Sequence, residues 1–182
     1  KDPNYALAYS GLADTYGLFP RFGAFRPKEY MPQAKAAALK ALELDPNLAE
    51  AHTSLAQIAL FYEYDFTGAE KSFKRAIELD PNYATARQWY GLLLAYIGKN
   101  EESVREAKKA FELDPFSLRI NSDLASSLAN ANRFDEALLQ NKKLNELFPD
   151  ERRFRGINGN IYAAQGKYDQ AVDELLLSFT AD

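Results

Sequence analysis

A four-residue phrase, Leu-Asp-Pro-Asn, recurs along this chain at nearly regular intervals. Residues 44–47 and 79–82 carry it intact, residues 113–116 end it with Phe, residues 147–150 hold a weaker form, and residues 2–4 a truncated one. Successive prolines of these phrases lie 43, 35, 34 and 34 residues apart. A period near 34 is typical of stacked helical repeats, which bury their apolar faces only against neighbouring repeats. The period therefore predicts an all-α solenoid.

Composition narrows the class of partner. The net charge is −4 and the pI is about 5.2, whereas nucleic acids and anionic membranes attract basic surfaces. Long uncharged stretches such as 51–62 and 88–98 are shorter than the roughly 18 to 20 residues of a spanning helix. We therefore expect neither nucleic-acid binding nor membrane insertion.

The chain contains no cysteine, which excludes disulfides and thiolate metal sites and fits a reducing compartment. We expect a cytoplasmic protein. The first residue, Lys1, lies inside the tail of a repeat phrase. This suggests a piece of a longer repeat array.

One unit, residues 84–115, shows how a repeat is built. Its first half carries apolar residues every three or four positions, as on one face of a helix: Ala86, Trp89, Tyr90, Leu93, Leu94 and Ile97. Gly98 favours a helix end, a second helical pattern follows, and Pro115 ends that pattern because proline disfavours helix in the residue before it. Each unit is thus predicted to be helix A, turn, helix B, turn.

These spacings resemble the tetratricopeptide repeat, a 34-residue helix–turn–helix unit. With proline at position 32, position 8 is held by Ala13, Ala56, Gly91, Ala125 and Gly159, and position 20 by Ala34, Ala69, Ser103, Ala137 and Ala171. Small residues there would let helices A and B approach closely. Position 7 is Leu12, Leu55, Tyr90, Leu124 and, less typically, Asn158. The resemblance implies a right-handed α-α superhelix of about five repeats in one domain, residues 1–182, with repeats near 6–46, 49–81, 84–115, 118–149 and 152–182.

Three departures from the pattern stand out. The first unit is nine residues longer than 34, with the excess expected between its helices, within 17–30. The second unit is one residue too long, near 62–66. The large aromatic expected at position 4 occurs only as Tyr9; the other units have His52, Arg87, Asn121 and Arg155. Looser or re-registered packing between A helices is expected there.

The first insertion is rich in aromatic residues and proline: Phe19, Pro20, Phe22, Phe25, Pro27 and Tyr30. One interpretation is that these aromatics cover the exposed core of the first repeat, as the end of any solenoid requires. The other is that the insertion arches over the groove as a lid or a ligand contact.

A second resemblance rests on one stretch, residues 63–70 running into 84–90. It looks like the repeat arrays of bacterial signalling proteins, among them cyclase-like proteins, serine/threonine kinases and winged-helix regulators. This resemblance implies a regulatory or sensor module of a larger protein.

No pattern points to catalysis. His52 has no second histidine or cysteine for a metal site, and is expected to be packed or interfacial. The carboxylate pairs at 101–102 and 135–136 lie at expected helix starts, where acidic residues are favoured by the helix dipole. We predict no enzyme activity, no metal and no cofactor.

The resemblance implies that partners bind in a concave groove lined by positions 2, 5, 9, 12 and 13 of each helix A. Carried over one by one, those positions are Ser10, Asp14, Glu50, Thr53, Gln57, Phe61, Gln88, Leu92, Tyr96, Arg119, Ser122, Ser126, Asn130, Arg153 and Asn160. The groove would then be mildly acidic at its first end and basic at its last. Scattered surface charge could produce the same pattern.

We therefore predict a non-catalytic scaffold that binds a peptide or protein in this groove. The two arginines suit an acidic or carboxylate-terminated segment, and Leu92 and Tyr96 an apolar side chain of it. The alternatives are the regulatory module and an oligomerisation device. The latter would use exposed end repeats, in which Leu175, Leu176, Leu177 and Phe179 are expected to be partly exposed.

Overall fold

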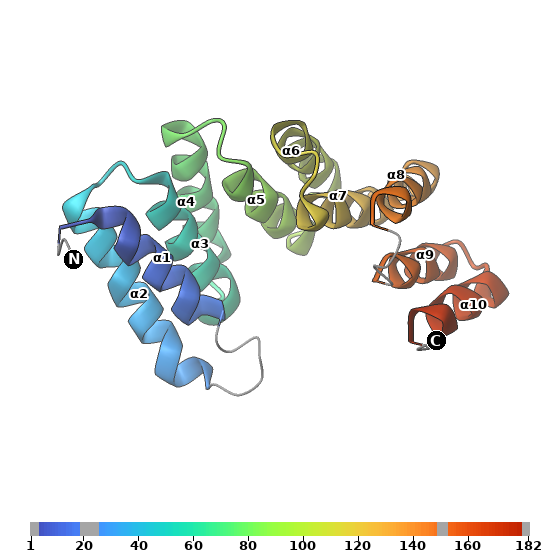
Figure 1. The fold of residues 1–182 in the computed structure, drawn as a ribbon, viewed down its shortest axis with the longest axis horizontal. Helices are drawn as coiled ribbons and strands as arrows, with labels where there is room; N and C mark the ends of the chain where they lie inside the picture. The colour runs from blue at the N-terminus through green and yellow to red at the C-terminus, as the bar shows by residue number, and fades with distance from the viewer. Residues whose placement is uncertain (1–3, 19–25, 149–152, 180–182) are drawn as a thin grey trace. The chain divides into compact units, whose positions relative to one another are not determined.

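The computed structural model describes residues 4–18, 26–148 and 153–179, without the side chains of residues 153 and 154. Every regular element in these ranges is a helix (Figure 1). The helices are α1 (Ala6–Leu18), α2 (Pro27–Leu44), α3 (Ala49–Ile58), the π-helical turn η2 (Ala59–Glu63), α4 (Phe66–Leu79), α5 (Ala84–Tyr96), α6 (Asn100–Leu113), α7 (Leu118–Asn130), α8 (Phe134–Leu147), α9 (Arg153–Ala164) and α10 (Tyr168–Phe179). The all-α fold class predicted from the repeat is confirmed.

The chain forms two compact units, Lys1–Leu93 and Leu94–Asp182, whose boundary falls inside α5. In the first unit α1 packs on α2 and α3 on α4, and α3 also contacts both α1 and α2. In the second unit α7 packs on α8 and α9 on α10, while α6 contacts α7 and α8 contacts α9. Consecutive helices therefore pair as helical hairpins, and the hairpins of a unit stack on one another.

The recurring phrase forms the turn between repeats. The Asp45 N–H donates to the Ala41 carbonyl and ends α2, while the Asp45 side chain accepts the Asn47 N–H at 2.9 Å. Asp80 and Asn82 make the same turn contact at 2.9 Å. Aspartate side chains favour such turns, and the intervening proline has no N–H with which to extend the helix. The phrase recurs because each repeat needs the same reversal of direction.

Polar residues replace the missing aromatic at position 4. Three of the four bind the proline carbonyl of the preceding turn: His52 Nε2 to Pro46 O at 3.1 Å, Arg87 Nε to Pro81 O at 3.0 Å, and Asn121 Nδ2 to Pro115 O at 2.8 Å. These contacts tie three A helices to the turns that precede them. The looser or re-registered packing expected between A helices stays a prediction, whereas His52 has a structural contact.

All ten small residues at positions 8 and 20 are buried. In the last repeat, a Cβ added at Gly159 would lie 2.6 Å from Leu175 Cγ and 3.2 Å from the Ala171 carbonyl oxygen. A methyl group does not fit at these distances, so α9 and α10 approach as closely as they do because residue 159 is glycine. The repeat register predicted from the sequence agrees with this burial.

The insertion in the first repeat lies partly in a helix, which corrects its predicted place between helices. Helix α1 continues to Leu18 and α2 begins at Pro27, a favoured first residue of a helix. Helix α2 has 18 residues, whereas α4, α6 and α8 have 14 each. Residues 19–25, with Phe19, Phe22 and Phe25, lie outside the described residues.

The extra residue of the second repeat is absorbed by a change of helix type. Helix α3 widens into the π-helical turn η2, and Tyr64 follows in the left-handed conformation at φ 56°. The Asp65 N–H then donates to the Ala59 carbonyl at 2.9 Å, and the Asp65 side chain caps α4 through the Gly68 N–H. The extra residue is therefore accommodated within the π-helical turn and the cap that follows it.

The second unit buries a set of polar pairs. Ser103 bonds Ser127 at 3.0 Å, Gln140 Nε2 donates to Asn121 Oδ1 at 2.8 Å, and Asn141 Nδ2 donates to Asn158 Oδ1 at 2.6 Å. Buried amides are tolerated when they are hydrogen-bonded. The atypical Asn158 at position 7 is explained by its partner on α8.

Candidate functional site

Six of the predicted groove residues lie on α1, α3 and η2 of the first unit: Ser10, Asp14, Glu50, Thr53, Gln57 and Phe61. Two of them are not accessible, which corrects their assignment as contact residues. Ser10 and Thr53 are each 1% exposed, and the Thr53 hydroxyl donates to the Ala49 carbonyl within α3. The other four remain at least partly exposed.

Two of these accessible residues form an acidic pair. Ser54 Oγ donates to Asp14 Oδ1 at 2.5 Å and lies 3.0 Å from the Glu50 carbonyl oxygen, which links α1 to α3. Burial of the carboxyl group raises the pKa of Asp14, the Ser54 hydrogen bond opposes the shift, and the charge of Glu50 adds to it. Among the described residues, neither carboxylate has a lysine or arginine as an ion-pair partner.

The charges of the acidic pair also affect the pKa of Tyr83, which lies in the turn before α5. Burial of its hydroxyl is the main cause that raises the pKa of Tyr83 to about 12, and the charges of Asp14 and Glu50 contribute next. The negative potential of the pair therefore reaches the end of the second repeat.

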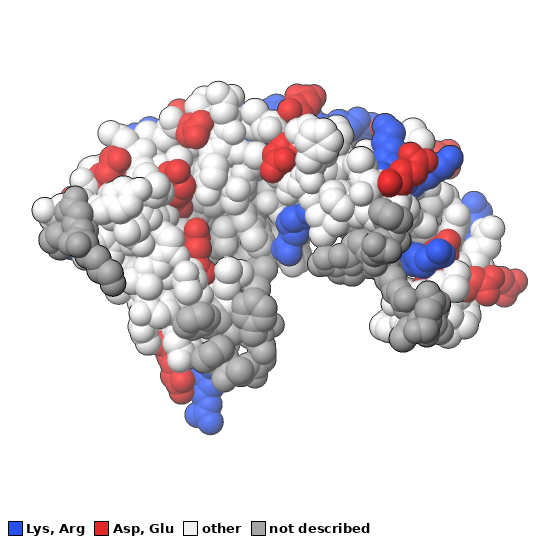
Figure 2. Space-filling view, in the orientation of Figure 1, with Lys and Arg blue, Asp and Glu red and all other residues white. Residues whose placement is uncertain are grey.

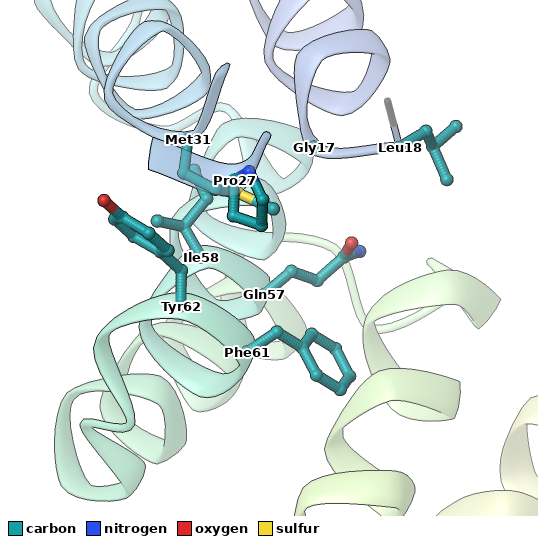
Figure 3. Close-up of a pocket in the computed structure, with 8 residues that line it drawn as sticks. All are labelled: Gly17, Leu18, Pro27, Met31, Gln57, Ile58, Phe61 and Tyr62. Atoms are coloured by element: carbon teal, nitrogen blue, oxygen red, sulfur yellow. The ribbon is translucent and has the colours of Figure 1, made fainter. Parts of the chain in front are cut away.

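A pocket of about 260 Å³ opens on the first unit (Figure 3). Its lining is largely apolar: Gly17, Leu18, Pro27, Met31, Gln57, Ile58, Phe61 and Tyr62. Figure 3 shows Gln57 and Phe61 extending in the same direction from successive turns of α3 and η2. Since both were predicted groove residues, the pocket adjoins the surface that the sequence indicated.

Phe61, which lines this pocket, makes an aromatic contact with helix α5. Its ring packs edge-to-face on Trp89 of α5, with ring centroids 5.6 Å apart and an interplanar angle of 78°. Such contacts are favourable and orient both rings. The single tryptophan of the chain therefore lies directly behind a pocket wall.

The three predicted residues of α5 differ in exposure. Gln88 is 8% exposed, which removes it from the accessible surface and corrects its assignment. Leu92 is half-buried, and Tyr96 is 60% exposed.

In the second unit, the predicted residues of α7 form a polar row. Arg119, Ser122, Ser126 and Asn130 recur at helical spacing, and all four are at least partly exposed. Arg119 makes an i,i+4 ion pair with Asp123 at 3.4 Å, a type of surface pair that stabilises a helix only weakly. Asn160 is exposed on α9. Arg153 begins α9, but its side chain lies outside the described residues, so its alignment with Arg119 stays a prediction.

Charges of both signs are interspersed on the face drawn in Figure 2. The described residues contain no group of three His, Cys, Asp or Glu side chains that could hold a metal ion. None of the helices among them combines the length and apolar character needed to cross a membrane.

The sequence profile of the tetratricopeptide repeat matches residues 58–117 and 122–181. The chain belongs to the tetratricopeptide repeat family. The two matched segments together cover most of the second repeat and nearly all of the three repeats that follow. No curated protein sequence is significantly similar to the chain.

Solved tetratricopeptide structures share this fold. The chain is 23% identical to PilF from Pseudomonas aeruginosa, with a TM-score of 0.76, over 96% of this chain and 75% of that one. It is 21% identical to YrrB, described as a TPR protein with an unusual peptide-binding site, with a TM-score of 0.66 over 97% of this chain and 86% of that one. For MamA the identity is 22% and the TM-score 0.68, over 84% of this chain and 89% of that one.

This tetratricopeptide chain also has a pocket that the sequence reasoning missed. It measures about 320 Å³ and is lined mainly by side chains of α6 and α8, above Leu124 and Leu128 of α7. Only helix A positions were considered as binding residues, whereas this pocket lies on the helix B side. Phe111 and Leu139 are apolar residues of two successive B helices, and they were the sequence signal for this pocket.

Proposed function

We propose that the chain is a non-catalytic protein-interaction scaffold that binds an extended peptide segment along its A helices. The observation that carries the proposal is the polar row of α7, whose four accessible side chains recur once per helical turn. A row of this kind can bind successive main-chain groups of a peptide. The peptide-binding site named for YrrB supports the same use of this fold.

The second unit suits a segment with carboxylate groups. Arginine forks bind carboxylates through two hydrogen bonds, and Arg119 is exposed on the row. Arg153 occupies the equivalent region of the next A helix. An acidic or carboxylate-terminated peptide is therefore the proposed ligand of this unit, with asparagines 130 and 160 as further hydrogen-bonding groups.

A peptide array tests this proposal. Acidic and carboxylate-terminated peptides are screened against the wild type, and each hit is titrated against the double variant Arg119→Glu with Arg153→Glu. We expect binding to weaken in the variant and to fall with added salt, because exposed charges are screened beyond about 8 to 10 Å. Arg105→Glu, an exposed change on α6, is the matched control. Equal binding by the wild type and the double variant would exclude the α7 surface.

A second candidate function is self-association through the last helix. Tyr168, Val172, Leu176 and Phe179 recur on one face of α10 and are 70%, 53%, 59% and 83% exposed. Exposed apolar faces of this kind often mark interaction surfaces. Leu177 is also exposed, as predicted, whereas Leu175 is half-buried and faces Gly159.

Sedimentation velocity over a range of concentrations distinguishes this candidate. If α10 mediates assembly, the wild type should form dimers or larger species as concentration rises, and Leu176→Glu should abolish them. Leu139→Glu, a similarly exposed leucine on α8, should leave assembly unchanged. A wild type that stays monomeric at all concentrations would eliminate self-association. The regulatory-module hypothesis stays a prediction about the parent protein.

A further inference from the structure

We propose that the pocket and the acidic pair of the first unit form one two-part site for a peptide that carries a basic residue two or three positions from a large apolar residue. The inference rests on the proposed scaffold function and names the ligand chemistry of a different part of the chain. The apolar side chain would enter the pocket, and the cation would lie at Asp14 and Glu50.

The pocket has the character of a side-chain receptor. Its walls are apolar, and its volume of about 260 Å³ exceeds that of one large side chain. Gln57 forms no hydrogen bond with any described residue. A pocket with apolar walls and one available amide matches the usual composition of a specific binding site. The amide is free to bind the main chain of a peptide whose side chain fills the pocket.

The acidic pair identifies the charge of the occupant. Asp14 and Glu50 lie close enough for the charge of one to raise the pKa of the other, and no described cation neutralises them. The two charges come from separate helices, and the hydrogen bond from Ser54 of α3 to the Asp14 carboxylate of α1 ties these helices together beside them. A lysine or arginine of a partner would relieve their repulsion, so charge complementarity favours a basic segment here.

Helix geometry sets the spacing between the two parts. Asp14 precedes Leu18 by four residues and Glu50 precedes Gln57 by seven, which correspond to about 6 and 10 Å along a helix. An extended peptide spans about 3.3 Å per residue. Two or three residues of peptide therefore bridge the acidic pair and the pocket.

The pocket depends on the two irregularities of the first repeats. Pro27 lies in the N-terminal extension of α2, and Phe61 and Tyr62 lie in the π-helical turn. Single π-helical turns are frequent at functional sites. The inserted residues thus form part of the pocket that adjoins the acidic pair.

Two glycines of α1 provide a matched pair of variants. Gly17 lines the pocket and Gly11 does not, and a Cβ added at either meets no atom of the described residues within 4 Å. Gly17→Leu should therefore fill the pocket without disturbing the helix, and Gly11→Leu should fold equally well with the pocket open. Glu50→Gln removes one charge of the acidic pair, and Glu43→Gln removes one from the exposed surface of α2.

The test begins with a displayed library of random dodecapeptides selected on the full chain. Selected peptides should carry Lys or Arg two or three residues from Phe, Leu or Met. Synthetic copies are then titrated by the fluorescence of Trp89, which lies behind the pocket wall. We expect Gly17→Leu to weaken binding about tenfold or more and Glu50→Gln about two- to fivefold, with Gly11→Leu and Glu43→Gln close to the wild type. Circular dichroism confirms that each variant is folded.

The possible outcomes are distinct. If selected peptides bind Gly17→Leu and Glu50→Gln as tightly as the wild type, the two-part site is wrong. Loss of the same binding in the Arg119 variants would then leave the scaffold function standing. A library that yields no peptide above background contradicts both proposals. Peptides enriched in acidic residues that still require an open pocket would overturn the charge assignment.

Discussion

At the residue scale, polar side chains occupy a repeat position where the family pattern has an aromatic residue. His52, Arg87 and Asn121 occupy this position, and each binds a proline carbonyl instead. The type of residue could be read from the sequence, but its partner could not. The partner lies six residues away in a turn whose geometry had to be known first.

The acidic pair leads to a prediction about stability and pH. The folded state raises the pKa of Asp14 above its ordinary value of 3.8, so folding disfavours the charged form. The stability of the wild type should therefore fall as pH rises from 3.8 through the raised pKa. Asp14→Asn keeps an acceptor for Ser54 and removes the charge, so it should raise the thermal midpoint at neutral pH and lose this advantage near pH 3.

Thermal unfolding of both proteins across the acidic range provides the measurement. Asp173→Asn, an exposed change on α10, serves as the control. A midpoint for Asp14→Asn that stays below the wild type at neutral pH would show that the carboxylate stabilises the fold.

A second residue-scale prediction concerns the buried amides of the second unit. Asn158→Leu restores the apolar residue common at position 7 but removes the acceptor of Asn141 Nδ2. The loss of one hydrogen bond costs about 0.5 to 1.5 kcal/mol, so the free energy of unfolding should fall by about that amount. Adding Asn141→Leu should recover part of the loss. Urea denaturation of the two single variants and the double variant tests the coupling, and additive losses would mean that the pair contributes little.

At the scale of elements, the sequence predicted the helices well because one period governs them all. The repeat phrase located the turns, and the small residues located the contacts between helices A and B. The irregular elements could not be predicted. One extra residue near residue 63 of the chain can form a longer loop, a bulge or a π-helical turn. Only the packing of α3 on its neighbours selects among these.

The register makes a direct prediction for the fourth repeat. Ala137 of α8 is 0% exposed and belongs to a core cluster with Leu124 and Leu128 of α7. Ala137→Phe should overpack this contact and lower the free energy of unfolding by about 1 to 3 kcal/mol or more. Chemical denaturation gives the value directly. A change near zero would be incompatible with the helix contact described here.

At the scale of the whole molecule, the groove positions carried over from the family pattern do not all lie on an accessible surface. Ser10, Thr53 and Gln88 occupy groove positions and are nevertheless buried. Exposure depends on how far each helix is rotated against its neighbours, which a position number does not specify. The pocket of the first unit was missed for a related reason, because half of its walls come from the two insertions.

The last prediction concerns how stability is distributed along the second unit. In a repeat protein each interface with a neighbour contributes separately to stability. Helix α7 packs against α6, α8 and α9, whereas α9 is the one helix of the described ranges against which α10 packs extensively. In dilute solution the amide protons of α10 should therefore exchange faster than those of α7, because opening α10 breaks fewer interfaces. Hydrogen exchange followed by mass spectrometry measures this difference, and equal protection in the monomer would contradict it. Protection of α10 that increases with protein concentration would instead favour self-association through its exposed apolar face.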